Sequence, residues 1–193
     1  MTAPSQQSIE EELGRAEEEL TRCREKIAQL RKLLAQPAVQ DYTFTGPNNA
    51  QVTLSSLFGE KDDLLLIHNM GASCVYCTLW ADGFNGVLPH LQDRTAFVVI
   101  SPDDPKSQER FAQQRGWRFP RFSSKGTTFR EDMGFQSGEE VLPGVSVFHK
   151  NADGSITHVS HAPFGPGDDY CAVWHLFDLL PEGSNGWEPK FKY

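Results

Sequence analysis

From residue 41 onward, short runs of apolar and β-branched residues alternate with longer stretches that can form helices. Strands joined by crossover helices run parallel, and the helices then cover both faces of their sheet. Asn151-Ala152-Asp153-Gly154 between two late strands is a hairpin signal. The pattern therefore predicts an α/β fold with a mixed sheet and helices on both faces. We expect strands at Tyr42–Thr45, Gln51–Thr53, Leu64–His68, Ala96–Ser101, Phe119–Ser123, Val145–His149 and Ile156–Ser160, and helices at Cys74–Leu91, Pro105–Arg115, Asp168–Leu180 and, more briefly, Thr127–Met133.

The first forty residues follow a different pattern. Ser8 with Glu11 three residues later is typical of a capping box, and Pro37 marks a stop, which predicts a helix from about Ile9 to Ala35. Apolar residues step along this segment by alternating intervals of four and three, which is the heptad spacing of a coiled coil. The residues of this seam are Ile9, Leu13, Ala16, Leu20, Cys23, Ile27, Leu30 and Leu34.

Charged residues flank this seam unequally. With Ile9 at heptad position d, the e and g positions carry Glu10, Glu12, Glu17 and Glu19 in the first half and Arg24, Lys26 and Arg31 in the second. Two antiparallel copies would place the acidic half against the basic half, so we expect a homodimer with antiparallel helices. The same apolar stripe could instead cover the chain's own globular domain, because it needs a partner surface but not a second copy.

The overall composition excludes some classes of binding partner. The 193 residues, 38% of them hydrophobic, suffice for one core with an appendage. A net charge of −8 disfavours nucleic acid and anionic membrane surfaces as partners. No apolar segment is long enough to span a membrane, and the acidic residues 1–20 do not resemble a secretory signal. We expect a cytoplasmic protein with a helical arm at 1–40, an α/β domain at 41–180 and a tail at 181–193.

Two cysteines mark the first predicted junction between a strand and a long helix. Cys74 and Cys77 follow the apolar run Leu64–Ile67 and lie at the predicted start of a helix. Cysteines with this spacing can close a small disulfide, and the helix N-terminus favours a thiolate on the first of them. The second lies one turn into the helix, where it is partly shielded. The arrangement predicts a dithiol redox site in which Cys74 attacks and Cys77 resolves.

Other readings of these cysteines stay open. Cys171 and His175 lie four residues apart on a predicted helix and share one face of it. Together with Cys74 and Cys77 they would form a Cys3His set suited to zinc. The cysteines could also be buried packing residues of an interaction protein that uses only its helical arm.

Several segments resemble thioredoxin-like domains of the alkyl hydroperoxide reductase and thiol-specific antioxidant type. The opening of such a domain is similar to residues 41–46 (DYTFTG) and 51–59 (QVTLSSLFG), followed by the apolar strand and the CxxC. More narrowly, residues 74–86 (CVYCTLWADGFNG), 116–120 (GWRFP), 144–148 (GVSVF) and 177–181 (FDLLP) resemble a bacterial thioredoxin-like family that is carried as a domain of unknown function. The resemblance implies a thioredoxin-like fold but does not specify a substrate.

The resemblance also bears on partners. It implies a protein or small molecule that carries a thiol or disulfide, with no cofactor. Tyr76 and Trp80 could form an apolar rim beside the exposed start of the helix. Pro143 precedes a predicted strand, as does a proline of thioredoxins whose cis form exposes the preceding backbone to an extended partner. The base rate for an X-Pro bond favours trans.

Two activities of related proteins fit these residues poorly. Peroxiredoxins carry Pro seven residues and Thr three residues before the attacking cysteine. Counting back from Cys74 gives Ile67 and Gly71, and counting back from Cys77 gives Met70 and Cys74. We therefore expect no ordinary peroxidase activity. Copper-delivery proteins of this fold suggest His158 or His161 as a third ligand beside the two cysteines, but those proteins use a CxxxC spacing.

Overall fold

A computed structural model describes residues 5–193. The chain divides into two compact units, one ending at Gln36 and one running from Pro37 to Tyr193. The boundary therefore lies four residues before the expected one, because Ala38 and Val39 pair with a strand of the second unit. Within the described residues, no helix is long and apolar enough to cross a membrane. Residues 1–4 of the acidic N-terminal segment lie outside the described part.

The first unit is a single long helix, α1 (Gln6–Lys32). Its N-cap is Ser5, whose hydroxyl accepts a hydrogen bond from the Ser8 N–H at 3.2 Å. The expected cap at Ser8 was wrong by one turn, because Ser8 is already helical and its N–H is the group being capped. The helix also ends earlier than expected, so Leu34 lies beyond it.

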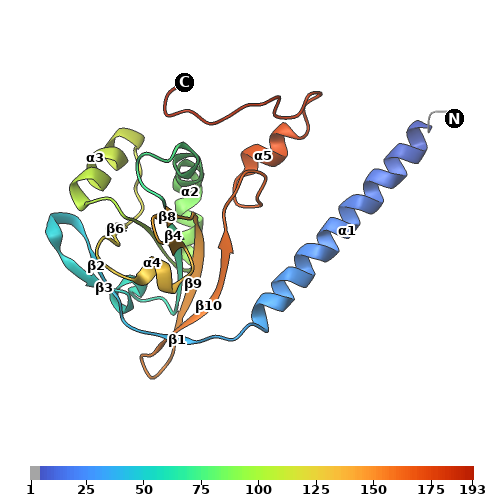
Figure 1. The fold of residues 1–193 in the computed structure, drawn as a ribbon. Coiled ribbons are helices and arrows are strands. Elements are labelled where there is room, and N and C mark those ends of the chain that lie inside the picture. Colours follow the sequence, from blue (N-terminus) through green and yellow to red (C-terminus); the bar gives the residue numbers. More distant parts are fainter. Residues whose placement is uncertain (1–4) are drawn as a thin grey trace. The chain divides into compact units, whose positions relative to one another are not determined.

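The second unit is built on an eight-stranded mixed sheet with the strand order β1-β10-β9-β4-β5-β6-β2-β3 (Figure 1). Its three central strands β4, β5 and β6 are parallel, and all other neighbours are antiparallel. The strands are β1 (Ala38–Val39), β2 (Thr43–Thr45), β3 (Gln51–Thr53), β4 (Asp63–His68), β5 (Ala96–Ser101), β6 (Arg121–Ser123), β9 (Gly144–Lys150) and β10 (Ile156–Pro163). A separate ribbon pairs β7 (Gln136–Ser137) with β8 (Glu140–Val141).

Helices pack on both faces of this sheet, as expected. The helices are α2 (Val75–Arg94), α3 (Pro105–Arg115), α4 (Phe129–Asp132) and α5 (Ala172–Phe177), with short 3-10 helices at Pro47–Asn49 and Ser55–Phe58. One core joins Leu64 and Leu66 of β4 to Phe129 of α4. The other joins Ile67 of β4 to α2 and to Trp174 of α5. Successive side chains of β4 thus point to opposite faces of the sheet and enter two different cores, and α2 packs in the second of them.

Most expected elements are present, with shifted ends. The expected helix Asp168–Leu180 is reduced to α5, because the Asp168 carboxylate accepts N–H groups of Gly165 and Tyr170 and holds a turn before it. Helix α2 continues past Leu91 to Arg94. The two-residue strands β1, β7 and β8 had been missed, since a run of two residues carries no periodic signal.

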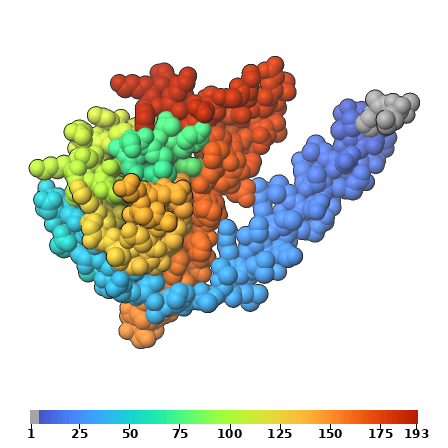
Figure 2. Space-filling model, viewed as in Figure 1, coloured from blue at the N-terminus to red at the C-terminus, as the bar shows by residue number. Residues whose placement is uncertain are grey.

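The C-terminal segment packs on the second unit. The ring of Trp187 lies 5.0 Å from Phe177 and 6.1 Å from Trp174, between ring centroids. Phe191 lies 6.2 Å from Phe111 of α3. In Figure 2 this dark red segment lies against the surface formed by α2 and α3. Residues 181–193 are therefore part of the compact unit.

A fully buried histidine, His68 at the end of β4, lies in the first core. Its Nε2 is 2.9 Å from the Ser146 hydroxyl, its ring stacks on Phe135 at 3.9 Å, and its Nδ1 has no partner. Burial holds the pKa of His68 well below its ordinary value, and burial also lowers the pKa of His158. The folded protein therefore keeps these imidazoles neutral.

This burial predicts a loss of stability in mild acid. The unfolded chain takes up protons at these imidazoles below about pH 6.5 while the folded chain does not, so protons favour unfolding there. Replacing His68→Leu together with Ser146→Ala should reduce the slope of the unfolding free energy between pH 6 and 5 by up to about 1.4 kcal/mol per pH unit. Urea unfolding at several pH values measures this slope. Ser146→Ala alone should keep it, and equal slopes in all three proteins would contradict the argument.

Candidate active site around Cys74 and Cys77

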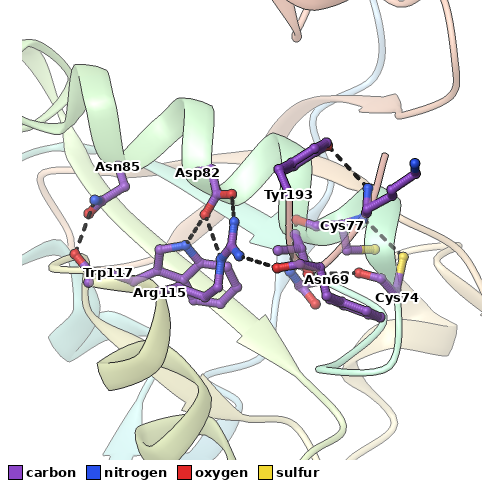
Figure 3. Close-up of polar contacts among 12 residues, drawn as sticks. Asn69, Cys74, Cys77, Asp82, Asn85, Arg115, Trp117 and Tyr193 are labelled. Carbon is purple, nitrogen blue, oxygen red and sulfur yellow. Dashed lines mark hydrogen bonds and ion pairs between the residues drawn. The ribbon is translucent and has the colours of Figure 1, made fainter. Parts of the chain in front are cut away.

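The CxxC lies at the junction between β4 and α2. Cys74 has an extended backbone conformation and is the N-cap of α2. Its Sγ accepts a hydrogen bond from the Cys77 N–H at 3.0 Å (Figure 3). A sulfur thus occupies the position that a serine or aspartate oxygen usually takes at a helix start. The N–H groups of the first turn are directed at Cys74.

Hydrogen bonding makes Cys74 the more acidic thiol. The Cys77 thiol and the N–H groups of Cys77 and Tyr76 donate to its sulfur and lower the pKa of Cys74 to about 7, against an opposing effect of burial. The side chain is half-buried and unoxidised. The lowered pKa favours the Cys74 thiolate, the form that attacks disulfides, at neutral pH.

Cys77 is the opposite of Cys74 in both exposure and acidity. It is only 3% exposed, and its Sγ accepts the Met70 N–H at 3.4 Å. Donation of its thiol hydrogen to Cys74 raises the pKa of Cys77, and burial raises it further. Cys77 therefore holds its proton while Cys74 is ionised.

The loop before Cys74 is held by two side chains that sequence reasoning missed. Asn69 accepts the Gly71 N–H at 2.7 Å, and Asp103 accepts the Ala72 N–H at 2.8 Å. Gly71 has a φ of +113°, and a Cβ there would lie 3.0 Å from the Asp103 carboxylate. Asp103 follows β5, which is parallel to β4, so the carboxyl ends of the two strands meet at one edge. A polar residue just after a predicted parallel strand is therefore the sequence signal that could have indicated Asp103 as a neighbour of the CxxC loop.

Arg130 of α4 is a buried cation beside this loop, and it was also missed. It is 1% exposed and donates to the Asn69 carbonyl at 2.8 Å and to the Leu142 carbonyl at 3.3 Å, while its Nε has no partner. Burial lowers the pKa of Arg130 to about 10, and the charges of Cys77 and Asp103 oppose this shift. Arg130 thus provides positive charge near Cys77. No local sequence pattern indicates this burial, because a single arginine in a short helix is usually solvated.

Of the two residues expected to form an aromatic rim, only Tyr76 is partly exposed. Tyr76 is half-buried, with its ring 6.3 Å from Trp80 and 6.2 Å from Trp174. Trp80 is 3% exposed, so it belongs to the core and cannot line an exposed rim. Its indole N–H donates to Asp168 at 3.4 Å.

Pro143 lies in a segment whose backbone is already paired. All peptide bonds among the described residues are trans, including the one before Pro143. The Leu142 N–H donates to the Phe135 carbonyl at 2.9 Å, and the Leu142 carbonyl accepts from Arg130. The Pro143 carbonyl accepts the Phe164 N–H at 3.0 Å. An extended partner pairing here would have to displace these internal bonds.

The candidate metal ligands do not converge. Among residues 5–193, no three His, Cys, Asp or Glu side chains are grouped to hold a metal ion. His175 lies instead 3.3 Å from Asp169 and 3.8 Å from Asp178. His158 and His161 stack on each other, and His158 also stacks on Phe148 of the first core, across the sheet from Cys77. Cys171 is buried, and burial raises the pKa of its thiol.

Asp82 and Asn85 on α2 have structural contacts. Asp82 forms an ion pair with Arg115 and accepts the Trp117 indole N–H at 2.7 Å (Figure 3). Asn85 accepts the Arg118 N–H at 2.8 Å. Arg115 also donates to the Phe191 carbonyl at 2.8 Å. These contacts tie α2 to α3 and to the C-terminal segment, which accounts for the two polar residues without assigning them acid–base chemistry.

The order of the strands and the position of the CxxC at the start of α2 define a protein with a thioredoxin-like fold. The chain belongs to the family of bacterial proteins of unknown function DUF899, which it matches over residues 4–192. The resemblance seen in the sequence is thereby confirmed. No curated protein matches the sequence significantly.

Solved structures with the same fold include several peroxiredoxins. Peroxidoxin BcpB from Mycobacterium tuberculosis is 22% identical, with a TM-score of 0.54 over 66% of this chain and 84% of that one. A cysteine mutant of PrxQ from Xylella fastidiosa is 14% identical, with a TM-score of 0.55 over 67% and 85%. Reduced Prx3 from Vibrio vulnificus, solved with hydrogen peroxide, is 12% identical, with a TM-score of 0.53 over 70% and 90%. At these identities the likeness establishes the fold.

Proposed function

We propose that the protein is a thiol–disulfide oxidoreductase that uses the Cys74–Cys77 dithiol. The observation that carries this proposal is the asymmetry of the pair. Cys74 caps α2 and has a pKa of about 7. The buried Cys77 keeps its proton, and its thiol donates a hydrogen bond to the Cys74 sulfur. An attacking thiol works best when its pKa is near the ambient pH, and a shielded neighbour is suited to the second step.

The exchange takes place in two steps. The Cys74 thiolate attacks one sulfur of a partner disulfide, and the other partner sulfur leaves as a thiolate that takes up a proton. Cys77 then loses its proton to solvent and attacks the Cys74 sulfur, which expels the second partner thiol. The protein loses two electrons and two protons and gains the Cys74–Cys77 disulfide, while the partner disulfide becomes two thiols. A second dithiol, from a protein or small molecule, must reduce the protein again.

The partner and the setting follow from this chemistry. The substrate class is a disulfide carried by a protein or a small molecule, and the reaction needs no cofactor. Tyr76 is the proposed contact to such a partner. The ring of Pro143 is a second proposed contact, through its side chain, since the backbone around it is paired internally. We place the protein in the cytoplasm, where thiols such as the exposed Cys23 stay reduced and disulfide exchange is transient.

Reaction with a simple disulfide under single-turnover conditions tests this proposal. Reduced protein mixed with glutathione disulfide at pH 7 should lose two thiols per disulfide consumed, and peptide mapping should place the new bond between Cys74 and Cys77. Metal analysis of protein purified without chelator should find less than stoichiometric zinc and copper. One equivalent of metal that is lost on Cys74→Ser would support the metal-binding alternative and count against the oxidoreductase.

Peroxide should be a poor substrate, although the neighbouring folds are peroxiredoxins. The positions that hold Pro and Thr in peroxiredoxins hold Ile67 and Gly71 when counted from Cys74, and Met70 and Cys74 when counted from Cys77. Neither count places the proline and threonine of the motif, which would help to align the peroxide bond and stabilise its leaving oxygen. The rate constant for hydrogen peroxide, expressed per thiolate, should stay within about tenfold of that for free cysteine. Stopped-flow measurement against a Cys74→Ser, Cys77→Ser control decides this, and rapid turnover would refute the argument.

A further inference from the structure

The helix α1 carries an apolar seam that nothing in its own unit covers. No residue of α1 is buried, and Ile9, Leu13, Leu20, Ile27 and Leu30 are 47–58% exposed. These residues recur at alternating intervals of four and three along a helix of 27 residues, about 40 Å in length. Such a seam is the contact surface of a coiled coil. We propose that it pairs with the α1 helix of a second copy of this chain, in antiparallel orientation.

The spacing of the seam defines the register of this pair. In an antiparallel coiled coil each a residue lies opposite a d residue of the partner, and here those pairs have residue numbers that sum to 43. Leu20 then lies opposite Cys23 of the partner, flanked by layers of Ala16 with Ile27 and Leu13 with Leu30. The next layer would join Ile9 to Leu34, but α1 ends at Lys32, so regular pairing stops before it.

Flanking charges favour this orientation. In the antiparallel pair, e positions face e positions and g positions face g positions of the partner. The facing residues are Glu10 with Arg31, Glu17 with Arg24, and Glu19 with Lys26. All three pairs are opposite in charge, and the twofold symmetry of the dimer repeats each of them. Opposite charges at these positions select the partner and its direction.

A parallel pair of the same helices would be poorly matched. There, each g residue faces the following e residue of the partner, which places Glu12 against Glu17 and Lys26 against Arg31. Only Glu19 and Arg24 would attract. Like charges at facing positions disfavour association, so the sequence of α1 selects against the parallel dimer.

Disulfide mapping of the full-length protein tests the register. In a Cys74→Ser, Cys77→Ser, Cys171→Ser background, one protein keeps Cys23 and a second carries Leu20→Cys with Cys23→Ser. After mild oxidation, neither protein alone should form a crosslinked dimer, whereas their mixture should form one. Efficient crosslinking of the Cys23 protein alone would indicate a parallel pair and overturn the proposal. A monomer by light scattering, or a dimer without the mixed crosslink, would also overturn the proposal. The seam would then contact a surface other than the α1 helix of a second copy.

Charge reversal supplies the matched control. Glu17→Lys with Glu19→Lys turns two attractive pairs into repulsive ones, and should raise the dimer dissociation constant by about tenfold or more in low salt. Adding Arg24→Glu and Lys26→Glu restores opposite charges and should restore the dimer. Glu11→Lys with Glu25→Lys changes the net charge equally at positions facing away from the seam and should leave the dissociation constant within about twofold. Equal effects of the two double variants in sedimentation would contradict the proposed register.

Discussion

Replacing Cys74 by serine should lower the rate of disulfide reduction by at least about a hundredfold, because Cys74 is the partly exposed thiol of the pair and has a pKa lowered to about 7. The Cys74 sulfur receives the Cys77 N–H and lies at the positive end of α2. A serine hydroxyl at the same N-cap would keep the capping hydrogen bond, so the variant should fold normally. The rate of single-turnover reduction of glutathione disulfide, followed by mass spectrometry, measures the loss.

The matched variant Cys77→Ser should behave differently. Its Cys74 can still attack, but no second thiol expels the partner, so a mixed disulfide should accumulate in stoichiometric amount. The serine hydroxyl can still donate to the Cys74 sulfur, so the variant should keep the lowered pKa of Cys74 that this hydrogen bond causes. Cys23→Ser is the control and should leave the rate unchanged. An equal loss of activity in all three variants, or none in Cys74→Ser, would contradict the assignment.

Replacing Arg130 should affect both stability and the resolving step. Arg130→Met removes the buried donor to two carbonyls, those of Asn69 and Leu142, and we expect the free energy of unfolding to fall by about 2–4 kcal/mol. It also removes the positive charge that favours a thiolate on Cys77. A further rise of one unit in the pKa of Cys77 would slow resolution by up to about tenfold.

The readouts for Arg130→Met separate these two effects. Urea unfolding measures the stability, and quenched-flow trapping measures how long the mixed disulfide with Cys74 persists. Arg110→Met replaces an exposed arginine of α3 and should change neither quantity. A destabilised Arg130→Met protein that resolves the mixed disulfide at the normal rate would limit Arg130 to a structural role.

The fold was predictable from the sequence to the extent that periodicity reports burial. The strands β4 and β5 and the helices α1, α2 and α3 were expected close to their observed positions, because their apolar patterns are long. The start of α5 was misplaced, since the Asp168 carboxylate holds a turn where periodicity suggested helix. The cap of α1 lies at Ser5 and not at Ser8, because any serine can cap a helix and the capping box at Ser8 and Glu11 did not exclude an earlier start.

The candidate site was only partly predictable. A CxxC after a strand and before a helix indicated Cys74 and Cys77, since the chemistry depends on local spacing. Asn69, Asp103 and Arg130 are brought to that junction from three separate elements, and their roles depend on tertiary contacts that no local pattern encodes. The burial of Trp80 and the pairing of the Leu142 backbone are likewise properties of packing.

The most direct test of the central claim is a redox titration of the Cys74–Cys77 pair against glutathione, with alkylation of the remaining thiols and peptide mapping. The account predicts one reversible two-electron transition in which Cys74 and Cys77 are oxidised together, while Cys23 and Cys171 stay alkylatable. The disulfide should disappear fully on reduction and re-form on reoxidation. If Cys74 and Cys77 remained thiols across the whole glutathione range, or formed disulfides only with Cys23 or Cys171, the protein would not be a dithiol oxidoreductase.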